Sequence, residues 1–66
     1  MKNSIKVERA RRNLSQQELA DAVDVSRQTI NAIEKGKFNP STMLALKISK
    51  IFELSVNDIF ELESDD

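Results

Sequence analysis

Apolar residues recur along this 66-residue chain at the three- and four-residue spacing of helices that bury one face. The clearest stripe predicts a helix that follows a cap at Ser41 and ends near Phe52. Shorter stripes predict two further helices over residues 15–23 and 26–36. The residues expected to face inward from these three helices are Leu19, Ala20, Val23, Ile30, Ile33, Leu44, Ala45, Ile48, Ile51 and Phe52.

Serine residues mark where the predicted helices begin. Ser15 and Glu18 have the spacing of a capping box, in which each side chain satisfies a free backbone N–H at the helix start. Ser26 is placed to cap the next helix, and Ser55 with Asp58 to open a short helix that turns Val56 and Ile59 inward.

Residues that tolerate a left-handed backbone stand between the stripes. The first helix is expected over residues 4–12 and is ended by Asn13, after which Leu14 enters the core. Asp24 and Val25 form the next turn, where Asp24 is expected to adopt a left-handed conformation at a modest local cost. Residues 37–40 form a loop, and the acidic tail over residues 61–66 is expected to fray at its end. The pattern therefore predicts an all-α, compact five-helix fold that makes one domain of residues 1–66.

The composition excludes several classes of protein. Hydrophobic residues make up 39% of the chain and charged residues 32%, which is typical of a folded helical domain. Cysteine and histidine are absent, so we expect no disulfide, no metal site, no cofactor and no enzyme activity. No apolar run approaches the roughly 18 residues that span a bilayer, and no signal-peptide pattern is visible, so a cytoplasmic location without membrane contact is expected.

The net charge of −1 argues against nucleic-acid binding until its distribution is considered. Residues 1–37 hold eight basic and five acidic side chains, a net charge of +3, whereas residues 38–66 hold two basic and six acidic ones, a net charge of −4. The basic half is also the half that contains residues 15–35, which have the pattern of two short helices joined by a tight turn.

Polar side chains on the second of these helices suggest base recognition. Arg suits guanine, and Gln or Asn suits adenine, when a helix presents its first turn to the major groove. On composition alone, an ordinary solvated helix face explains these side chains as well. The candidate base-contacting residues are Arg27, Gln28, Thr29 and Asn31.

Four motifs in the correct order resemble the lambda-repressor/Cro-like helix-turn-helix domains, the XRE family. They are LSQQELA at residues 14–20, VSRQTINAIEKG at 25–36, NPS at 39–41 and LSVNDIF at 54–60. The resemblance implies a five-helix DNA-binding regulator. The chain is similar to small stand-alone members, some of which are dimers with a short antiparallel sheet made by the two chain ends. It departs from the family at Asp24 and Glu53, where glycine is common, and at Glu8, where relatives are often apolar.

The resemblance also assigns roles beyond the base contacts. It implies a structural ion pair between Arg9 and Glu34, and it points Gln16 at a phosphate. Arg11 and Arg12 are expected on the solvated surface, with contact to the DNA backbone as the alternative. Candidate phosphate-contacting residues, for which a plain solvated surface is the alternative, are Gln16, Ser26, Lys35, Lys37 and Asn39.

A single recognition helix reads only a few base pairs, and this favours a two-fold homodimer. Four apolar residues are not clearly required by the core and are candidates for its interface, with completion of the packing of a small domain as the alternative: Met43, Leu46, Phe60 and Leu62. The sequence therefore predicts a double-stranded DNA-binding transcriptional regulator, a repressor of a palindromic operator, with no small-molecule ligand evident. The rival interpretation is a protein-interaction module, such as an antitoxin or adaptor, that uses the same fold.

Overall fold

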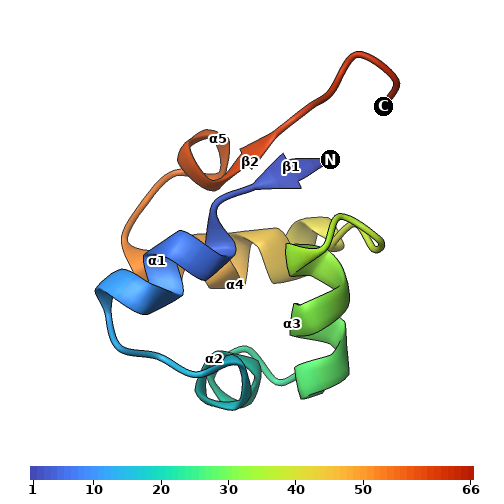
Figure 1. Ribbon diagram of the computed structural model, residues 1–66. Helices are drawn as coiled ribbons and strands as arrows, with labels where there is room; N and C mark the ends of the chain where they lie inside the picture. Colours follow the sequence, from blue (N-terminus) through green and yellow to red (C-terminus); the bar gives the residue numbers. More distant parts are fainter.

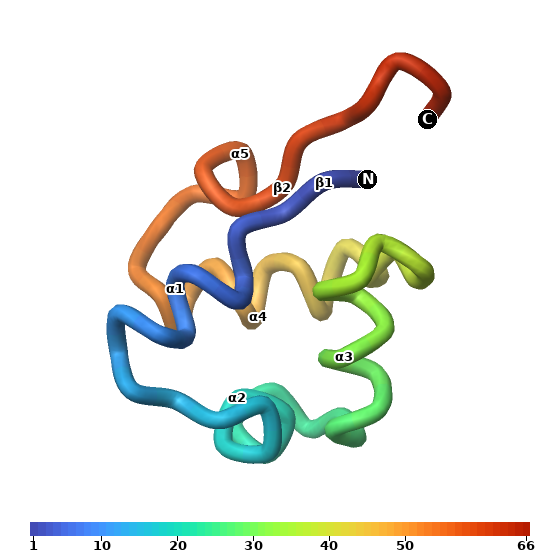
Figure 2. The backbone as a smooth tube through the Cα atoms, in the orientation of Figure 1, coloured from blue at the N-terminus to red at the C-terminus, as the bar shows by residue number.

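The computed structural model describes residues 1–66 and contains five helices and one two-stranded sheet (Figure 1). The elements in chain order are β1 (Lys2–Asn3), α1 (Ile5–Arg11), α2 (Gln16–Ala22), α3 (Arg27–Glu34), α4 (Thr42–Phe52), α5 (Val56–Ile59) and β2 (Phe60–Glu61). The predicted helical fold is confirmed, and the chain ends form the small sheet. The tube in Figure 2 shows α5 and the sheet together on one side and α2 on the other, with α1, α3 and α4 between them.

The capping pattern read from the sequence is present at four helix starts. Ser15 Oγ accepts a hydrogen bond from the Glu18 backbone N–H at 2.9 Å, and the Glu18 carboxylate accepts one from the Ser15 N–H at 2.9 Å. Ser55 and Asp58 make the second capping box, while Ser26 and Ser41 each cap with the side-chain oxygen alone. These local interactions set where the helices begin.

Three residues other than glycine take positive φ angles, and each lies at a helix C-terminus. Asn13 has φ 53° and Asp24 has φ 60°, so the left-handed backbone predicted at both positions is confirmed. Glu53, with φ 55°, is the C-cap of α4.

Twelve buried apolar residues form one core, to which every helix contributes. Leu14 and Val56, both expected to face inward, are partly buried against it. Ile51 was predicted beside the buried stripe of α4, but it is 38% exposed. It lies at the edge of that helical face, so the core covers it incompletely.

The first and last segments of the chain pair with each other. Lys2 lies opposite Glu61 and Asn3 opposite Phe60 in the antiparallel sheet, and the Met1 amino group lies 3.2 Å from the Asp66 carboxylate. The hydrogen bond with Asp66 raises the pKa of the Met1 amino group above its ordinary value. The end of the acidic tail, expected to fray, is exposed, but Asp66 makes this contact.

Long-range polar contacts complete the fold. The Asn3 side-chain amide donates to the Ile33 carbonyl at 2.8 Å, near the C-terminus of α3, and its Oδ1 accepts from the Ile5 N–H. Glu8 is only 7% exposed and receives hydrogen bonds from Arg11 and Arg12. No helix in the structure combines the length and the apolar character required to cross a membrane.

Candidate nucleic-acid interface

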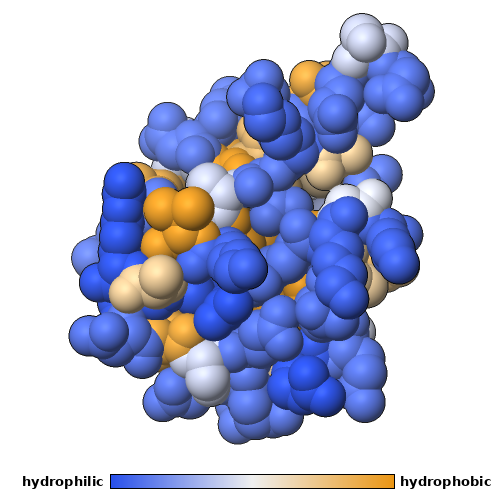
Figure 3. All heavy atoms as spheres, in the orientation of Figure 1, coloured by the Kyte–Doolittle hydropathy of each residue, from blue (hydrophilic) through white to orange (hydrophobic).

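The α2–α3 unit presents the start of α3 to solvent. Asp24 turns the chain after α2, and the Val25 N–H donates to the Ala20 carbonyl at 3.0 Å, which closes the turn. Ile30 and Ile33 bury one face of α3 in the core. Figure 1 shows α3 at the periphery of the molecule, and the space-filling view in Figure 3 is almost entirely hydrophilic over α2 and α3.

Arg27 and Gln28 occupy the first turn of α3. Both are exposed, and the structure gives neither side chain a hydrogen bond or ion pair within the protein. Asn31 lies one turn further along the same side of the helix and is half-buried. This arrangement leaves the donors of Arg27 and the amide of Gln28 available to an external partner.

Thr29 and Ser26 are engaged with each other at the start of α3. Their hydroxyl oxygens lie 3.0 Å apart, and Ser26 Oγ also accepts from the Thr29 N–H at 3.2 Å. Both hydroxyls therefore help to form the cap, and contact with DNA would come in addition to that role.

The ion pair implied by the family resemblance is present. Arg9 Nε donates to Glu34 Oε2 at 2.6 Å and a terminal nitrogen donates to Oε1 at 3.1 Å, so the pairing is bidentate. The two side chains are 14% and 6% exposed. Hydrogen bonding to Glu34 raises the pKa of Arg9 further above its ordinary value. Because Arg9 also donates to the Leu14 carbonyl, it joins α1, the following turn and α3.

Gln16 also binds Glu34 of this ion pair. Its side-chain nitrogen donates to Glu34 Oε1 at 3.1 Å and to Asn31 Oδ1 at 3.2 Å. The residue expected at a phosphate thus connects α2 to the candidate base-contacting residue Asn31.

The loop after α3 carries the remaining basic candidates. Lys35 is the C-cap of α3, and Lys37 and Asn39 follow it; all three are exposed and make no side-chain hydrogen bond or ion pair. Gly36, with φ 73°, provides the left-handed turn that lets the Lys37 N–H return to the Ala32 carbonyl at 2.9 Å.

Two residues near this surface were missed by the sequence analysis. Ala32 lies one turn beyond Gln28 on α3 and is half-buried, and Phe38 in the loop is 50% exposed. An apolar residue on a helix is normally assigned to a core, so only the α3 geometry shows that Ala32 borders the exposed face.

Arg11 and Arg12 differ from each other. Arg11 is exposed beside Glu8, as expected. Arg12 is exposed as well, as expected, and it also donates to the Glu8 carboxylate at 2.8 Å and to the Phe52 carbonyl at 2.6 Å. Its guanidinium lies 4.8 Å from the centre of the Phe52 ring, so packing against α4 holds it.

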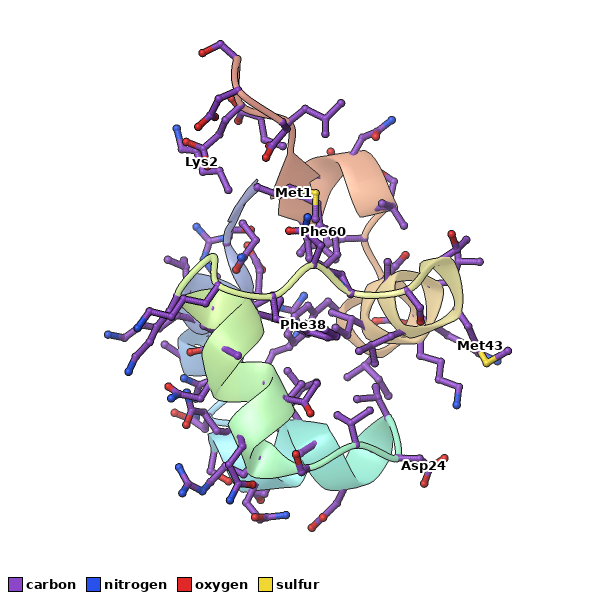
Figure 4. The ribbon with its side chains drawn as sticks, turned by 90° about the vertical axis from the view of Figure 1, so that its right-hand side faces the viewer. Met1, Lys2, Asp24, Phe38, Met43 and Phe60 are labelled. Carbon is purple, nitrogen blue, oxygen red and sulfur yellow. The ribbon has the colours of Figure 1, made fainter.

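The four residues predicted at a dimer interface lie in three different settings. Leu46 and Leu62 are 57% and 77% exposed. Phe60 fits the alternative role, core packing: it is 7% exposed and belongs to the core, because β2 pairs with β1 and turns its ring inward. Met43 is 68% exposed but borders a separate hollow with Val25. Figure 4 shows Met43 well away from Met1 and Phe60, which lie together.

An apolar hollow of about 220 Å³ adjoins Leu46. Met1, Val56 and Phe60 line this hollow and also a second one, which extends to Leu62. Leu46 and Leu62 therefore flank one continuous set of lining residues, which we call the Leu46–Leu62 surface.

Comparisons with known proteins place the chain in a family. The helix-turn-helix family model HTH_3 matches residues 5–59. The chain is 54% identical over 66 residues to an HTH-type transcriptional regulator of Methanocaldococcus jannaschii, covering 100% of both chains. It is 51% identical to the HTH-type transcriptional regulator YgzD of Bacillus subtilis over 98% of both.

Solved structures agree with this result. The restriction-modification controller protein C.AhdI of Aeromonas hydrophila superposes with a TM-score of 0.77 at 25% identity, over 85% of each chain. The clp gene regulator ClgR of Corynebacterium glutamicum gives a TM-score of 0.77 at 27% identity, over 83% of this chain and 58% of ClgR.

The fold and the exposed start of α3 thus define a helix-turn-helix protein of the DNA-binding transcriptional regulator class. The chain belongs to the XRE-type helix-turn-helix family, whose named relatives are regulators and not enzymes.

Proposed function

We propose that this protein represses transcription in the cytoplasm by binding a palindromic operator as a homodimer, with α3 of each copy in the major groove. The observation that carries the proposal is the pair of exposed side chains on the first turn of α3, Arg27 and Gln28, which have no partner within the protein. In a helix-turn-helix, this turn reaches the base edges.

Each candidate residue has a chemically defined role in this complex. Arg27 donates to guanine, Gln28 forms a bidentate pair with adenine, and Thr29 contacts a thymine methyl group. Asn31 completes the base-contacting set. The phosphate contacts, which fix the register of the helix, come from Ser26, Lys35, Lys37 and Asn39.

Exposed basic side chains at both ends of α3 support this orientation. Arg27 lies at its start and Lys35 and Lys37 follow its end, and none of the three makes an ion pair within the protein. They attract the phosphates locally, although residues 15–37 together carry three basic and four acidic side chains and the net charge of +3 over residues 1–37 comes from residues 1–14.

A second copy is proposed at the Leu46–Leu62 surface. Leu46 and Leu62 are exposed beside the hollow of about 220 Å³, and a self-complementary contact there satisfies two-fold symmetry. Two recognition helices about one DNA turn apart double the base contacts, and occupation of the operator is sufficient to block transcription without a second protein surface.

The test is selection of bound sequences from a random duplex library, followed by titration of the selected duplex at several salt concentrations. The wild type is expected to select an inverted repeat and to show a steep salt dependence. Arg27→Ala and Gln28→Ala are each expected to reduce discrimination against mismatched sites about tenfold or more, with the fold intact by circular dichroism.

Arg11→Ala is the matched control, because Arg11 is an exposed arginine on α1 that pairs only with Glu8. It is expected to keep the selected sequence. If the intact protein binds no duplex, the proposal is wrong and the protein-interaction interpretation takes its place. An equal loss of discrimination against mismatched sites in Arg11→Ala and Arg27→Ala would show that α3 has no special role in recognition.

A further inference from the structure

The contacts between Gln16, Glu34 and Asn31 determine which atom of each amide faces the other. Both carboxylate oxygens of Glu34 accept hydrogen bonds from Arg9, so a side-chain atom that faces Glu34 Oε1 must be a donor. The Gln16 atom that lies 3.1 Å from Glu34 Oε1 must then be the nitrogen. The same nitrogen lies 3.2 Å from Asn31, whose facing atom must be the oxygen, since two nitrogens there would oppose donor to donor.

This orientation leaves a defined group of Asn31 free. Its oxygen points toward Gln16, so its Nδ2 lies on the other side of the amide, and the structure gives Nδ2 no partner in the protein. Asn31 is half-buried and shares a helix side with the exposed Arg27. It therefore offers donors to the outside, whereas bidentate recognition of adenine requires the oxygen as well.

Both amide hydrogens of Gln16 are engaged in hydrogen bonds within the protein. An amide nitrogen has two hydrogens, and the Gln16 nitrogen directs them to Glu34 and Asn31. The atom that remains is its oxygen, an acceptor, which gains nothing from a phosphate oxygen. A phosphate contact by Gln16 would require one of these two hydrogen bonds to break.

We propose that Arg9, Glu34 and Gln16 form a relay that fixes the Asn31 amide as a hydrogen-bond donor toward DNA. Asn31 then favours guanine, which presents the two acceptors N7 and O6, or thymine, whose O4 accepts. Adenine is disfavoured because its single acceptor N7 stands beside the N6 donor, and cytosine because it presents only a donor. Gln16 is a positioning residue for Asn31 and not a phosphate anchor. The proposal rests on the proposed function for its DNA partner, and it adds the chemistry of one base contact.

The DNA test compares Gln16→Met with the wild type by library selection and salt titration. The base read by Asn31 is the position at which Asn31→Ala loses preference. In the wild type this base is guanine or thymine. Methionine keeps the length of the side chain but removes the donor, so the Asn31 amide is free to turn, and adenine gains about tenfold relative to guanine or thymine. The salt slope is unchanged.

Gln17→Met is the matched control, because Gln17 is the next residue, is exposed and bonds only to Asp21. This variant is expected to leave unchanged both the base preference at the Asn31 position and the dependence of DNA affinity on salt concentration. Gln16→Met overturns the proposal if it weakens all sequences equally and lowers the salt slope by about one, the result for a phosphate contact. Adenine or cytosine at the Asn31 position of the wild type also overturns it.

A measurement without DNA separates this proposal from the proposed function. In ¹⁵N-labelled protein, the Gln16 side-chain amide hydrogens are expected to exchange with water about tenfold more slowly than those of Gln28. This protection is reduced in Asn31→Ala, which removes one of the two acceptors. Equal exchange of Gln16 and Gln28 overturns the relay. If the Gln16 amide is protected but the protein binds no duplex, the relay is supported and the proposed function is wrong.

Discussion

Positive φ angles are the clearest conformational cost at the level of single residues. Asn13, Asp24 and Glu53 each hold a left-handed backbone where a helix ends. Glycine takes this conformation freely, and Asn and Asp tolerate it better than other residues, whereas a longer side chain pays about 1–2 kcal/mol. Glu53 is therefore the most strained of the three.

Glu53→Gly is expected to raise the free energy of unfolding by about 1 kcal/mol, because the relief of strain exceeds the added flexibility of the unfolded chain. Asp24→Gly gains less, since aspartate already tolerates the conformation. Urea unfolding followed by circular dichroism measures both. Ala10→Gly, within α1 and exposed, serves as the control and loses about 1 kcal/mol. A loss of stability in Glu53→Gly would contradict this account.

At the scale of elements, α3 is held by side chains from three different segments. Asn3 of β1 binds the Ile33 carbonyl, Arg9 of α1 pairs with Glu34, and Gln16 of α2 contacts both Glu34 and Asn31. The exposed face of α3 is thus fixed from its middle to its C-terminal end, while Arg27 and Gln28 at its start stay unbound.

Asn3→Ala removes two of these hydrogen bonds, to Ile33 and from Ile5. It is expected to lower the free energy of unfolding by about 1–2 kcal/mol. Amide hydrogen exchange at Gly36 and Lys37 should accelerate more than in the core. Asn57→Ala is the control, because Asn57 is exposed and makes no side-chain hydrogen bond. Unchanged exchange at the end of α3 would show that Asn3 does not hold it.

The elements were predictable where their signals are local. Ser15 with Glu18 and Ser55 with Asp58 mark helix starts within four residues of sequence, and the turn at Asp24 follows from its backbone preference. The contacts of Asn3 with Ile33 and of Gln16 with Asn31 were not predictable. They join positions 30 and 15 residues apart, and only the packed fold brings these side chains together.

At the scale of the whole molecule, the start of α3 and the Leu46–Leu62 surface lie on different elements. Base contacts are proposed on α3, whereas the second surface is built from α4, α5 and the paired chain ends. Assembly through the second surface would leave both recognition helices free, which is the geometry that a palindromic site requires.

Leu46→Glu is expected to convert the proposed dimer to a monomer and to weaken binding to the full operator about 100-fold or more, because the second half-site contact is no longer intramolecular. Sedimentation velocity and operator titration measure the two effects. Val7→Glu places the same charge at a 51% exposed apolar residue on α1 and is the control. If Leu46→Glu sediments like the wild type, the Leu46–Leu62 surface is not the dimer interface.

The paired chain ends have a consequence for engineering. The Met1 amino group lies 3.2 Å from the side chain of Asp66, and the sheet holds the flanking residues in register. A few residues are therefore enough to connect the two ends covalently, and new ends opened in the exposed turn at Asn13 separate no pair of strands. The helices can therefore be joined in a different covalent order. A circularly permuted chain opened at Asn13 would begin with α2 and end with α1, and both new termini would be remote from the sheet.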